Sequence, residues 1–137
     1  MTLNFEDRNA IVTLRMQRAK ETLQEAKDNV DMKHWRVVAN RLYYACYYAA
    51  SALLINNGHL ARTHSGVVSL LNLHFVLNGL ISEEQGNLYG KLFTLRQEGD
   101  YNDWKIVQAE EVLSKIVPAE KFITTIEKLI SSSQQKN

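Results

Sequence analysis

The sequence predicts an all-α protein, an up-and-down antiparallel bundle of four principal helices with a short additional helix. Proline occurs once and glycine six times in 137 residues, and no run of alternating valine or threonine suggests a strand. Several segments instead carry apolar residues at steps of three and four. The connections between them are short, which favours antiparallel neighbours. A chain of this length is typical of one domain, so we expect a helical domain over residues 1–130 and a polar tail over residues 131–137.

The first predicted helix spans residues 7–30 and has a single apolar stripe, with charged residues on its other faces. We expect these charged faces to meet water. The stripe consists of Val12, Met16, Ala19, Leu23, Ala26 and Val30.

The second predicted helix spans residues 31–56, with Asp31 as its amino-terminal cap and Gly58 just beyond its end. It is apolar on two sides, which predicts a central position in the bundle or burial in a subunit interface. One stripe contains Trp35, Val38, Leu42, Ala45, Ala49 and Ala52, and the other contains Val37, Tyr44, Tyr48 and Ile55.

A shorter third helix is expected from Thr63 or His64 to Leu77, ending near Gly79. The next helix begins at Ser82, because residues 82–85 have the form of a capping box, and Gly99 should end it.

Asp103 or a neighbour is expected to cap the final helix, whose apolar stripe ends at Ile130. Pro118 should kink or split this helix, because proline removes a helical hydrogen bond and clashes with the preceding turn.

Composition excludes several classes of function. A net charge of +1 removes the global attraction to nucleic acid that a strongly basic protein has, so any nucleic-acid contact must be local. Cys46 is the only cysteine, which excludes an intramolecular disulfide and suits a reducing cytoplasm. No apolar run is long enough to span a membrane, and the amino terminus does not resemble an export signal. We therefore expect a cytoplasmic protein.

Motifs for metal and phosphate-loop chemistry are missing. The four histidines show no metal-ligand spacing, and the sequence contains no HExxH, GxxxxGK or GxSxG pattern. The sequence predicts neither a metal site nor a cofactor.

Asn40 and Arg41 are unusual because they are strongly polar and lie within the most apolar helix. In one interpretation Arg41 reaches solvent and Asn40 makes an interhelical hydrogen bond. In the other, both side chains line a polar cleft.

A second group of polar residues begins at Arg96, which continues the helical face of Tyr89 and Phe93 and should therefore point into the bundle. A structural interpretation pairs Arg96 with Asp100, four residues on. A functional interpretation uses the planar guanidinium to bind phosphate and to stabilise charge on it.

His64 opens the third predicted helix, in the sequence Arg62-Thr63-His64-Ser65-Gly66. Histidine is a natural general base, although lone histidines at helix ends are more often hydrogen-bonding groups. Cys46 is interpreted as a small buried apolar residue.

Six blocks of sequence, in order, resemble the HEPN-domain family of small prokaryotic helical proteins, over residues 8–130. The similarity implies a four-helix bundle that is commonly a homodimer. It also implies a partner, because many relatives are encoded beside a minimal nucleotidyltransferase and act with it as toxin and antitoxin. Other HEPN proteins are metal-independent ribonucleases that use an arginine and a histidine four to six residues apart, at the dimer cleft. The blocks are Asn40-Arg41-Leu42-Tyr43-Tyr44-Ala45, Ala52-Leu53-Leu54 before Gly58, Thr63-His64-Ser65-Gly66-Val67, Phe75-Val76 with Gly79, Arg96 with Asp100-Tyr101, and Ala119-Glu120-Lys121-Phe122-Ile123.

The resemblance assigns roles to particular positions. Arg96 matches the motif arginine, and Asn40 matches the polar position of the second helix. No histidine follows Arg96 at the motif spacing, and Asp100-Tyr101 instead resembles the branch of the family that lacks it. Arg96 and Asn40 are therefore the candidate catalytic residues, and the candidate residues for binding RNA or a nucleotide phosphate are Arg41, His64, Asp100 and Tyr101.

Two functions follow from these residues. The first is a toxin-like or regulatory protein paired with a nucleotidyltransferase, with a polar cleft for RNA or nucleotide phosphate and metal-independent ribonuclease activity. The second is a noncatalytic dimeric interaction module, in which Arg96 and Asp100 only hold helices together.

Overall fold

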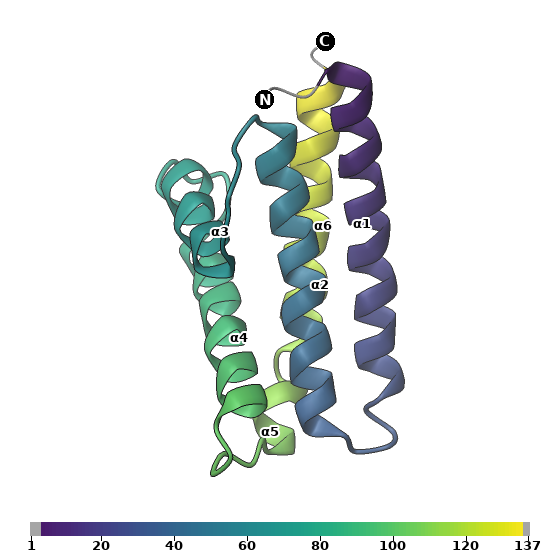
Figure 1. The fold of residues 1–137 in the computed structure, drawn as a ribbon, viewed down its shortest axis with the longest axis vertical. Coiled ribbons are helices and arrows are strands. Elements are labelled where there is room, and N and C mark those ends of the chain that lie inside the picture. The colour runs from purple at the N-terminus through teal and green to yellow at the C-terminus, as the bar shows by residue number, and fades with distance from the viewer. Residues whose placement is uncertain (1–3, 136–137) are drawn as a thin grey trace.

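Four long helices form the bundle in the computed structural model, which describes residues 4–135. They are α1 (Phe5–Asp28), α2 (Trp35–Asn56), α4 (Glu83–Tyr101) and α6 (Ile116–Gln135). Helices α1 and α4 run in the opposite direction to α2 and α6 (Figure 1). The shorter elements are α3 (His64–Leu71), which continues into the π-helical turn η1 (Asn72–Val76), and α5 (Ala109–Leu113). The predicted all-α bundle is confirmed.

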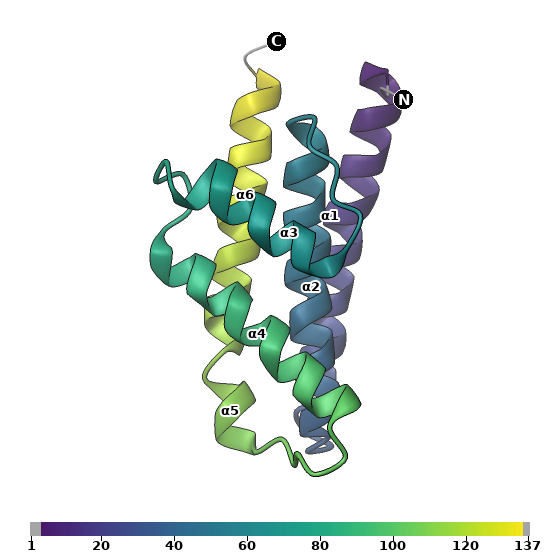
Figure 2. The same ribbon diagram turned by 60° about the vertical axis from the view of Figure 1, so that its left-hand side comes forward.

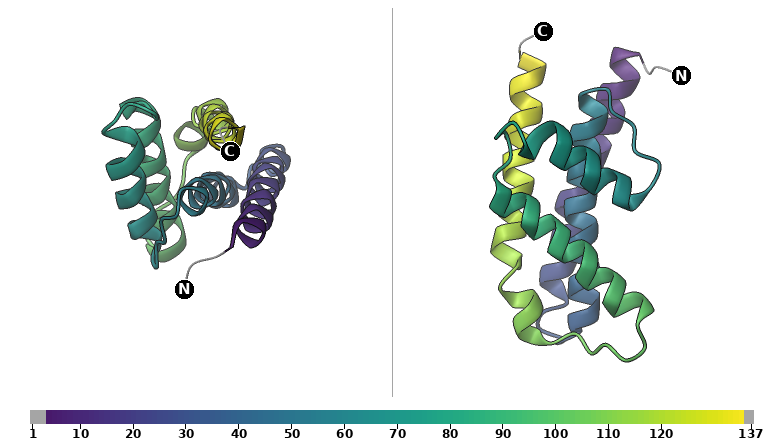
Figure 3. Two further views of the ribbon diagram at one scale, coloured as in Figure 1. Left: turned by 90° about the horizontal axis from the view of Figure 1, so that it is seen from above. Right: turned by 90° about the vertical axis from the view of Figure 1, so that its left-hand side faces the viewer.

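Helix α2 occupies the centre of the bundle. Seen from above, it is surrounded by α1, α6 and the pair formed by α3 and α4 (Figure 3). Its first apolar stripe is buried from Val38 to Ala52, while Tyr44, Tyr48 and Ile55 of the second stripe are half-buried. The two-sided pattern in the sequence therefore reflects a helix with neighbours on most of its circumference.

Helices α3 and α4 cross the face of the bundle diagonally (Figure 2). Because α4 descends across α2, its carboxyl-terminal half lies beside the amino-terminal half of α2, and Asp100 contacts Asn40 from 60 residues away. This crossing brings together the polar residues that the sequence singles out.

Helix α2 begins at Trp35, four residues later than predicted, and Asp31 lies in the preceding turn rather than at the cap. Lys33 has a φ of 58°, a left-handed conformation that a right-handed helix does not contain, so α2 can begin only after this residue. At the other end the prediction is confirmed, since α2 stops at Asn56 and Gly58 has a φ of +82°.

The prediction that Gly99 ends the fourth helix is wrong, because α4 continues to Tyr101 with Gly99 buried inside it. A Cβ atom at this position would lie 3.1 Å from Val107 and 3.4 Å from Arg36, so the glycine allows both side chains to pack closely against the helix. Asp103 does not cap a helix either, because the next helix, α5, is capped by Gln108.

Ser82 caps α4, accepting a hydrogen bond from the backbone N–H of Gln85 at 3.1 Å. The expected capping box is only half formed, because the Gln85 side chain donates to Thr125 of α6 instead of turning back to the cap.

The final helical region is split, as Pro118 suggested, but the break lies at residues 114–115 and Pro118 is the third residue of α6. Proline is tolerated in the first turn because the N–H groups there have no helical partner. Helix α6 continues to Gln135, so most of the expected polar tail is helical. The Gln134 side chain helps to hold this end of α6 against the bundle, because it donates to the side chains of Asn9 in α1 and Asn56 in α2.

Candidate functional site

All six candidate residues belong to one connected group of side chains, where α4 crosses α2 and α3 begins. Asn40 and Arg41 come from α2, His64 is the first residue of α3, and Arg96, Asp100 and Tyr101 come from the end of α4. The contacts that join them pass through Tyr43 and Tyr44, which the sequence had not singled out as site residues.

Asn40 is fixed by hydrogen bonds on both sides of its amide. Its Nδ2 donates to Oδ2 of Asp100 at 2.9 Å, and its Oδ1 accepts from Nε and Nη2 of Arg41 at 3.0 and 2.7 Å. Arg41 also reaches Glu25 of α1, with 3.2 Å between Nη1 and Oε1. Asn40 therefore makes the interhelical hydrogen bond expected of a structural residue, and it also orients Arg41 and Asp100 at the edge of the site.

Arg96 is buried, with 6% of its surface exposed, as its place on the face of Tyr89 and Phe93 predicts. Its Cζ atom lies over three aromatic rings, 4.9 Å from the centroid of Tyr43, 5.6 Å from that of Tyr44 and 5.7 Å from that of Tyr101. These cation–π contacts partly compensate for the loss of water around the charge.

Arg96 does not form the ion pair with Asp100 that the structural interpretation requires. Within residues 4–135, no salt bridge involves Arg96, and its buried Nε has no hydrogen-bond partner. The carboxylate of Asp100 is used by Asn40 instead. A buried guanidinium without an acidic partner retains donors in a fork that matches phosphate.

His64 contacts two tyrosines of α2, Tyr43 and Tyr47. Its Nδ1 lies 2.9 Å from the hydroxyl of Tyr43, and its ring stacks on Tyr47 with 4.5 Å between centroids. Burial and the nearby positive charge of Arg96 lower the pKa of His64 below its ordinary value. Burial also raises the pKa of Tyr43 to about 12, so its hydroxyl remains protonated at neutral pH.

The start of α3 holds His64 in this position. The side chain of Thr63 accepts a hydrogen bond from the N–H of Gly66 at 2.9 Å, which caps the helix. A Cβ atom on residue 66 would lie 2.9 Å from the same threonine oxygen, so a larger residue at this position would displace the Thr63 side chain.

Tyr43 was not predicted as a site residue because its place in an apolar helix is typical of the core, and it is indeed fully buried. Its position between Arg96 and His64 depends on the crossing of three helices. The available signal was the pair Tyr43-Tyr44, separated from Asn40-Arg41 by one residue and followed one turn later by Tyr47-Tyr48.

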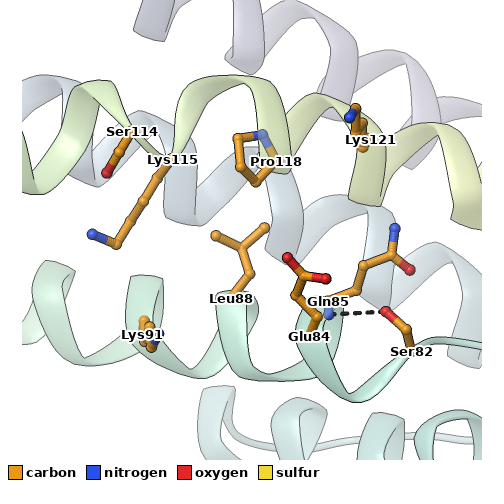
Figure 4. Close-up of a pocket in the computed structure, with 9 residues that line it drawn as sticks. All are labelled: Ser82, Glu84, Gln85, Leu88, Lys91, Ser114, Lys115, Pro118 and Lys121. Atoms are coloured by element: carbon orange, nitrogen blue, oxygen red, sulfur yellow. Dashed lines mark hydrogen bonds between the residues drawn. The ribbon is translucent and has the colours of Figure 1, made fainter.

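A separate groove of about 440 Å³ lies between α4 and the junction of α5 with α6. Figure 4 shows Leu88 and Pro118 facing each other across it, with lysine side chains at its borders. None of the six candidate residues lines this groove.

Over residues 4–135, no group of three or more histidine, cysteine or acidic side chains is placed to hold a metal ion, and no helix has the length and apolar character needed to cross a membrane.

Stability is expected to fall as the pH drops below about 6.5. Burial also lowers the pKa of His59, whose ring stacks on His74 at 3.9 Å, so His59 and His64 both favour the neutral form in the folded state. The unfolded chain then binds more protons between the ordinary pKa and the lowered values, and the stabilisation present above the ordinary pKa is lost in that window. Urea unfolding at pH 7.5 and 5.5 measures this, and His64→Gln should reduce the difference. An unchanged difference in His64→Gln would show that His64 does not contribute.

Three comparisons relate this chain to known proteins. It is 36% identical over 126 residues to a UPF0332 protein of Thermotoga maritima, covering 92% of this chain and 96% of the relative. It is 35% identical to a protein of Methanocaldococcus jannaschii named "Putative toxin MJ0605", covering 93% of this chain and 94% of that one.

The fold also matches a crystal structure, that of TT1696 from Thermus thermophilus. The TM-score is 0.60 at 16% identity, and the match covers 92% of this chain and 98% of the other. Residues 12–129, which include all six candidate residues, match the HEPN domain family. The chain therefore belongs to the HEPN domain family.

Proposed function

We propose that this protein is a toxin-like HEPN protein that acts in the cytoplasm, binds RNA phosphate beside Arg96 and cleaves the RNA without a metal ion. We further propose that it is a homodimer and that a minimal nucleotidyltransferase is its regulatory partner. The observation that carries the proposal is the buried guanidinium of Arg96, which has no acidic partner within residues 4–135 and has an unbonded Nε.

Arg96 would stabilise the charge that develops on the phosphate during cleavage. A donor fixed in a site of low dielectric is worth more than one in water, and it needs no rearrangement as the charge forms. The ring of Tyr101 lies over the guanidinium while being 75% exposed, so movement of this exposed side chain would uncover one side of Arg96.

His64 would take the place of the histidine that does not follow Arg96 in the sequence. In the tautomer whose Nδ1–H donates to the Tyr43 oxygen, Nε2 keeps its lone pair and can accept the proton of the attacking hydroxyl. The lowered pKa keeps the imidazole neutral at pH 7, which is the form a general base requires. Asn40, fixed by Asp100 and Arg41, would position the phosphate.

Two of the family relationships support this function. A relative 35% identical to this chain carries the name "Putative toxin MJ0605". All six candidate residues lie within the matched HEPN domain. Arg96 also resembles the motif arginine of the family, which supports a phosphate site that needs no metal ion.

The proposal is tested by incubating a labelled mixed RNA pool with the purified protein in EDTA. We expect cleavage by the wild type and a loss of about 100-fold or more in rate for Arg96→Ala and for His64→Gln, the usual effect of removing a charge-stabilising donor or a general base. Circular dichroism confirms that each variant is folded. Cleavage by Arg96→Ala at the wild-type rate would exclude the assigned role.

A second candidate is a noncatalytic dimeric protein-interaction module. The observation in its favour is the loop after α4, where Trp104 is 93% exposed and Ile106 is 75% exposed. No cleavage by the folded wild type in the same assay would favour this function.

A further inference from the structure

One side of α2 is not covered by any other helix of residues 4–135. Seen from above, α1, α6 and the pair of α3 and α4 lie around its other sides (Figure 3). The uncovered side lies between α1 and α3, because half-buried tyrosines of α2 contact Arg18 of α1 and His64 of α3 there. We call Tyr44, Tyr47 and Tyr48 the tyrosine face.

The rings of the tyrosine face lie close together along the helix. The centroids of Tyr44 and Tyr48 are 6.2 Å apart, and those of Tyr47 and Tyr48 are 5.7 Å apart. Each side chain is half-buried, so the fold holds the ring while part of it remains in contact with water. Because the rings are already ordered, a flat group that stacks on them causes little further loss of entropy.

Arginines border the tyrosine face. The Cζ atom of Arg18 lies 5.7 Å from the ring centroid of Tyr48, and that of Arg41 lies 5.4 Å from the ring centroid of Tyr44. Arg15, also from α1, lines a small cavity with one ring of the tyrosine face. The uncovered side of α2 therefore combines aromatic rings with positive charge.

These arginines have few acidic partners. Within residues 4–135, Arg15 and Arg18 form no salt bridge, and Arg41 forms one, with Glu25 at 3.2 Å. A guanidinium binds phosphate through its planar fork and stacks on rings through its flat face. A polyanion that carries flat bases therefore matches this surface, although the charge of the whole chain is only +1.

The tyrosine face is continuous with the phosphate site at Arg96. Tyr44 belongs to the tyrosine face, and its ring centroid lies 5.6 Å from Cζ of Arg96. The ring of His64 lies 5.7 Å from the same centroid. An RNA strand with one phosphate beside Arg96 can therefore continue over Tyr44 and Tyr48.

We propose that the tyrosine face is a binding platform for single-stranded RNA, on which bases stack while Arg15, Arg18 and Arg41 hold the phosphates. This inference rests on the proposed function, because it extends the strand bound at Arg96. A ring can stack only on a base whose face is uncovered, so paired segments do not bind on this face. Every base has such a face, so the platform selects unpaired segments without reading their sequence.

A second copy of this chain fits the tyrosine face less well. A two-fold interface places the same surface patch of each copy opposite itself. The arginines beside the tyrosines would then face the same arginines of the other copy, and like charges at an interface are unfavourable.

The test is fluorescence anisotropy with a labelled single-stranded oligoribonucleotide whose 2′-hydroxyls are methylated. The methyl groups remove the hydroxyl nucleophile beside each phosphate, so the strand stays intact and binding is measured alone. We expect Tyr48→Ala to weaken binding about 5-fold to 150-fold, the usual effect of removing one stacking ring. Tyr48→Phe keeps the ring and should bind as the wild type does. A duplex of the same sequence should bind the wild type more weakly than the single strand.

Arg18→Gln tests the phosphate contacts. It should weaken binding and reduce the slope of log affinity against log salt by about 0.7, the value for one phosphate contact on a single strand. Lys121→Gln is the control, because it removes the same charge from the border of the separate groove between α4 and α6 (Figure 4). This variant should keep the affinity and the salt slope of the wild type.

The outcomes separate this inference from the proposed function. Unchanged binding by Tyr48→Ala overturns the inference, while the cleavage assay in EDTA reports separately on the Arg96 site. If Tyr48→Ala instead changes the oligomeric state in sedimentation, the tyrosine face is a contact between copies and the inference is wrong. Binding that depends on Tyr48, without cleavage of the RNA pool, supports the platform and overturns the ribonuclease activity. A wild type that neither binds nor cleaves overturns both.

Discussion

Replacing Arg96 by methionine is expected to leave the protein at least as stable as the wild type while reducing its affinity for RNA by about 10-fold to 150-fold. Hydrogen bonds to a charged group contribute about 1.5 to 3 kcal/mol, which gives this range of affinity. The charge of Arg96 has no acidic partner within residues 4–135, so its burial is costly to folding. Methionine keeps most of the side-chain volume beside Tyr43 and Tyr44, and we expect a gain in unfolding free energy of up to about 2 kcal/mol.

Urea unfolding and fluorescence anisotropy with a labelled RNA measure the two effects on the same preparation. Arg96→Lys is the matched control, because it keeps the charge and loses the planar fork, and it should retain part of the affinity. A loss of more than about 2 kcal/mol of stability in Arg96→Met would show that the arginine holds helices together. That result would favour the noncatalytic interaction module.

The inward direction of Arg96 could be predicted from the sequence because helical periodicity alone determines it. Tyr89, Phe93 and Arg96 lie on one face of α4, and the apolar members of that face must meet the core. The partner of Asp100 could not be predicted in this way. Local reasoning favours Arg96 four residues earlier, whereas the actual partner is Asn40 on another helix. The crossing of α4 over α2 determines that contact.

The place of His64 illustrates the same limit. The resemblance to the HEPN family showed that the motif histidine is missing after Arg96, but the contact of His64 with Tyr43 spans 21 residues and two helices. Gly99 was misassigned for a related reason. Glycine often ends helices, yet here it permits Val107 and Arg36 to approach α4, and neither contact leaves a local signal. Apolar stripes are short-range features and were largely predictable, while the predicted roles of Asp31, Gly99 and Asp103 at helix ends were wrong and the site is assembled by long-range packing.

Stacked aromatic rings connect the site to the centre of the bundle. Phe122 of α6 lies 5.5 Å from Tyr89, which lies 5.9 Å from Tyr43 with the two planes 7° apart. Tyr43 in turn contacts Arg96 and His64. Phe122, Tyr89 and Tyr43 are each at most 1% exposed. The stacked rings therefore connect the site to Phe122 of α6, although Phe122 stacks on Tyr89 and on none of the six candidate residues.

Phe122→Ala is expected to lower the unfolding free energy by about 3 to 5 kcal/mol, because it removes a fully buried ring and leaves a cavity. Val117→Ala, in the exposed first turn of the same helix, should cost no more than about 0.5 kcal/mol. Phe122→Leu should cost less than Phe122→Ala, because leucine fills more of the cavity. Loss of the ring under Tyr89 also loosens Tyr43, so the pKa of His64, followed by NMR titration in the folded Phe122→Leu protein, should move back towards its ordinary value. If stability falls and the His64 pKa does not move, the rings contribute only to the core, and the geometry of the site is set by α3 and α4 alone.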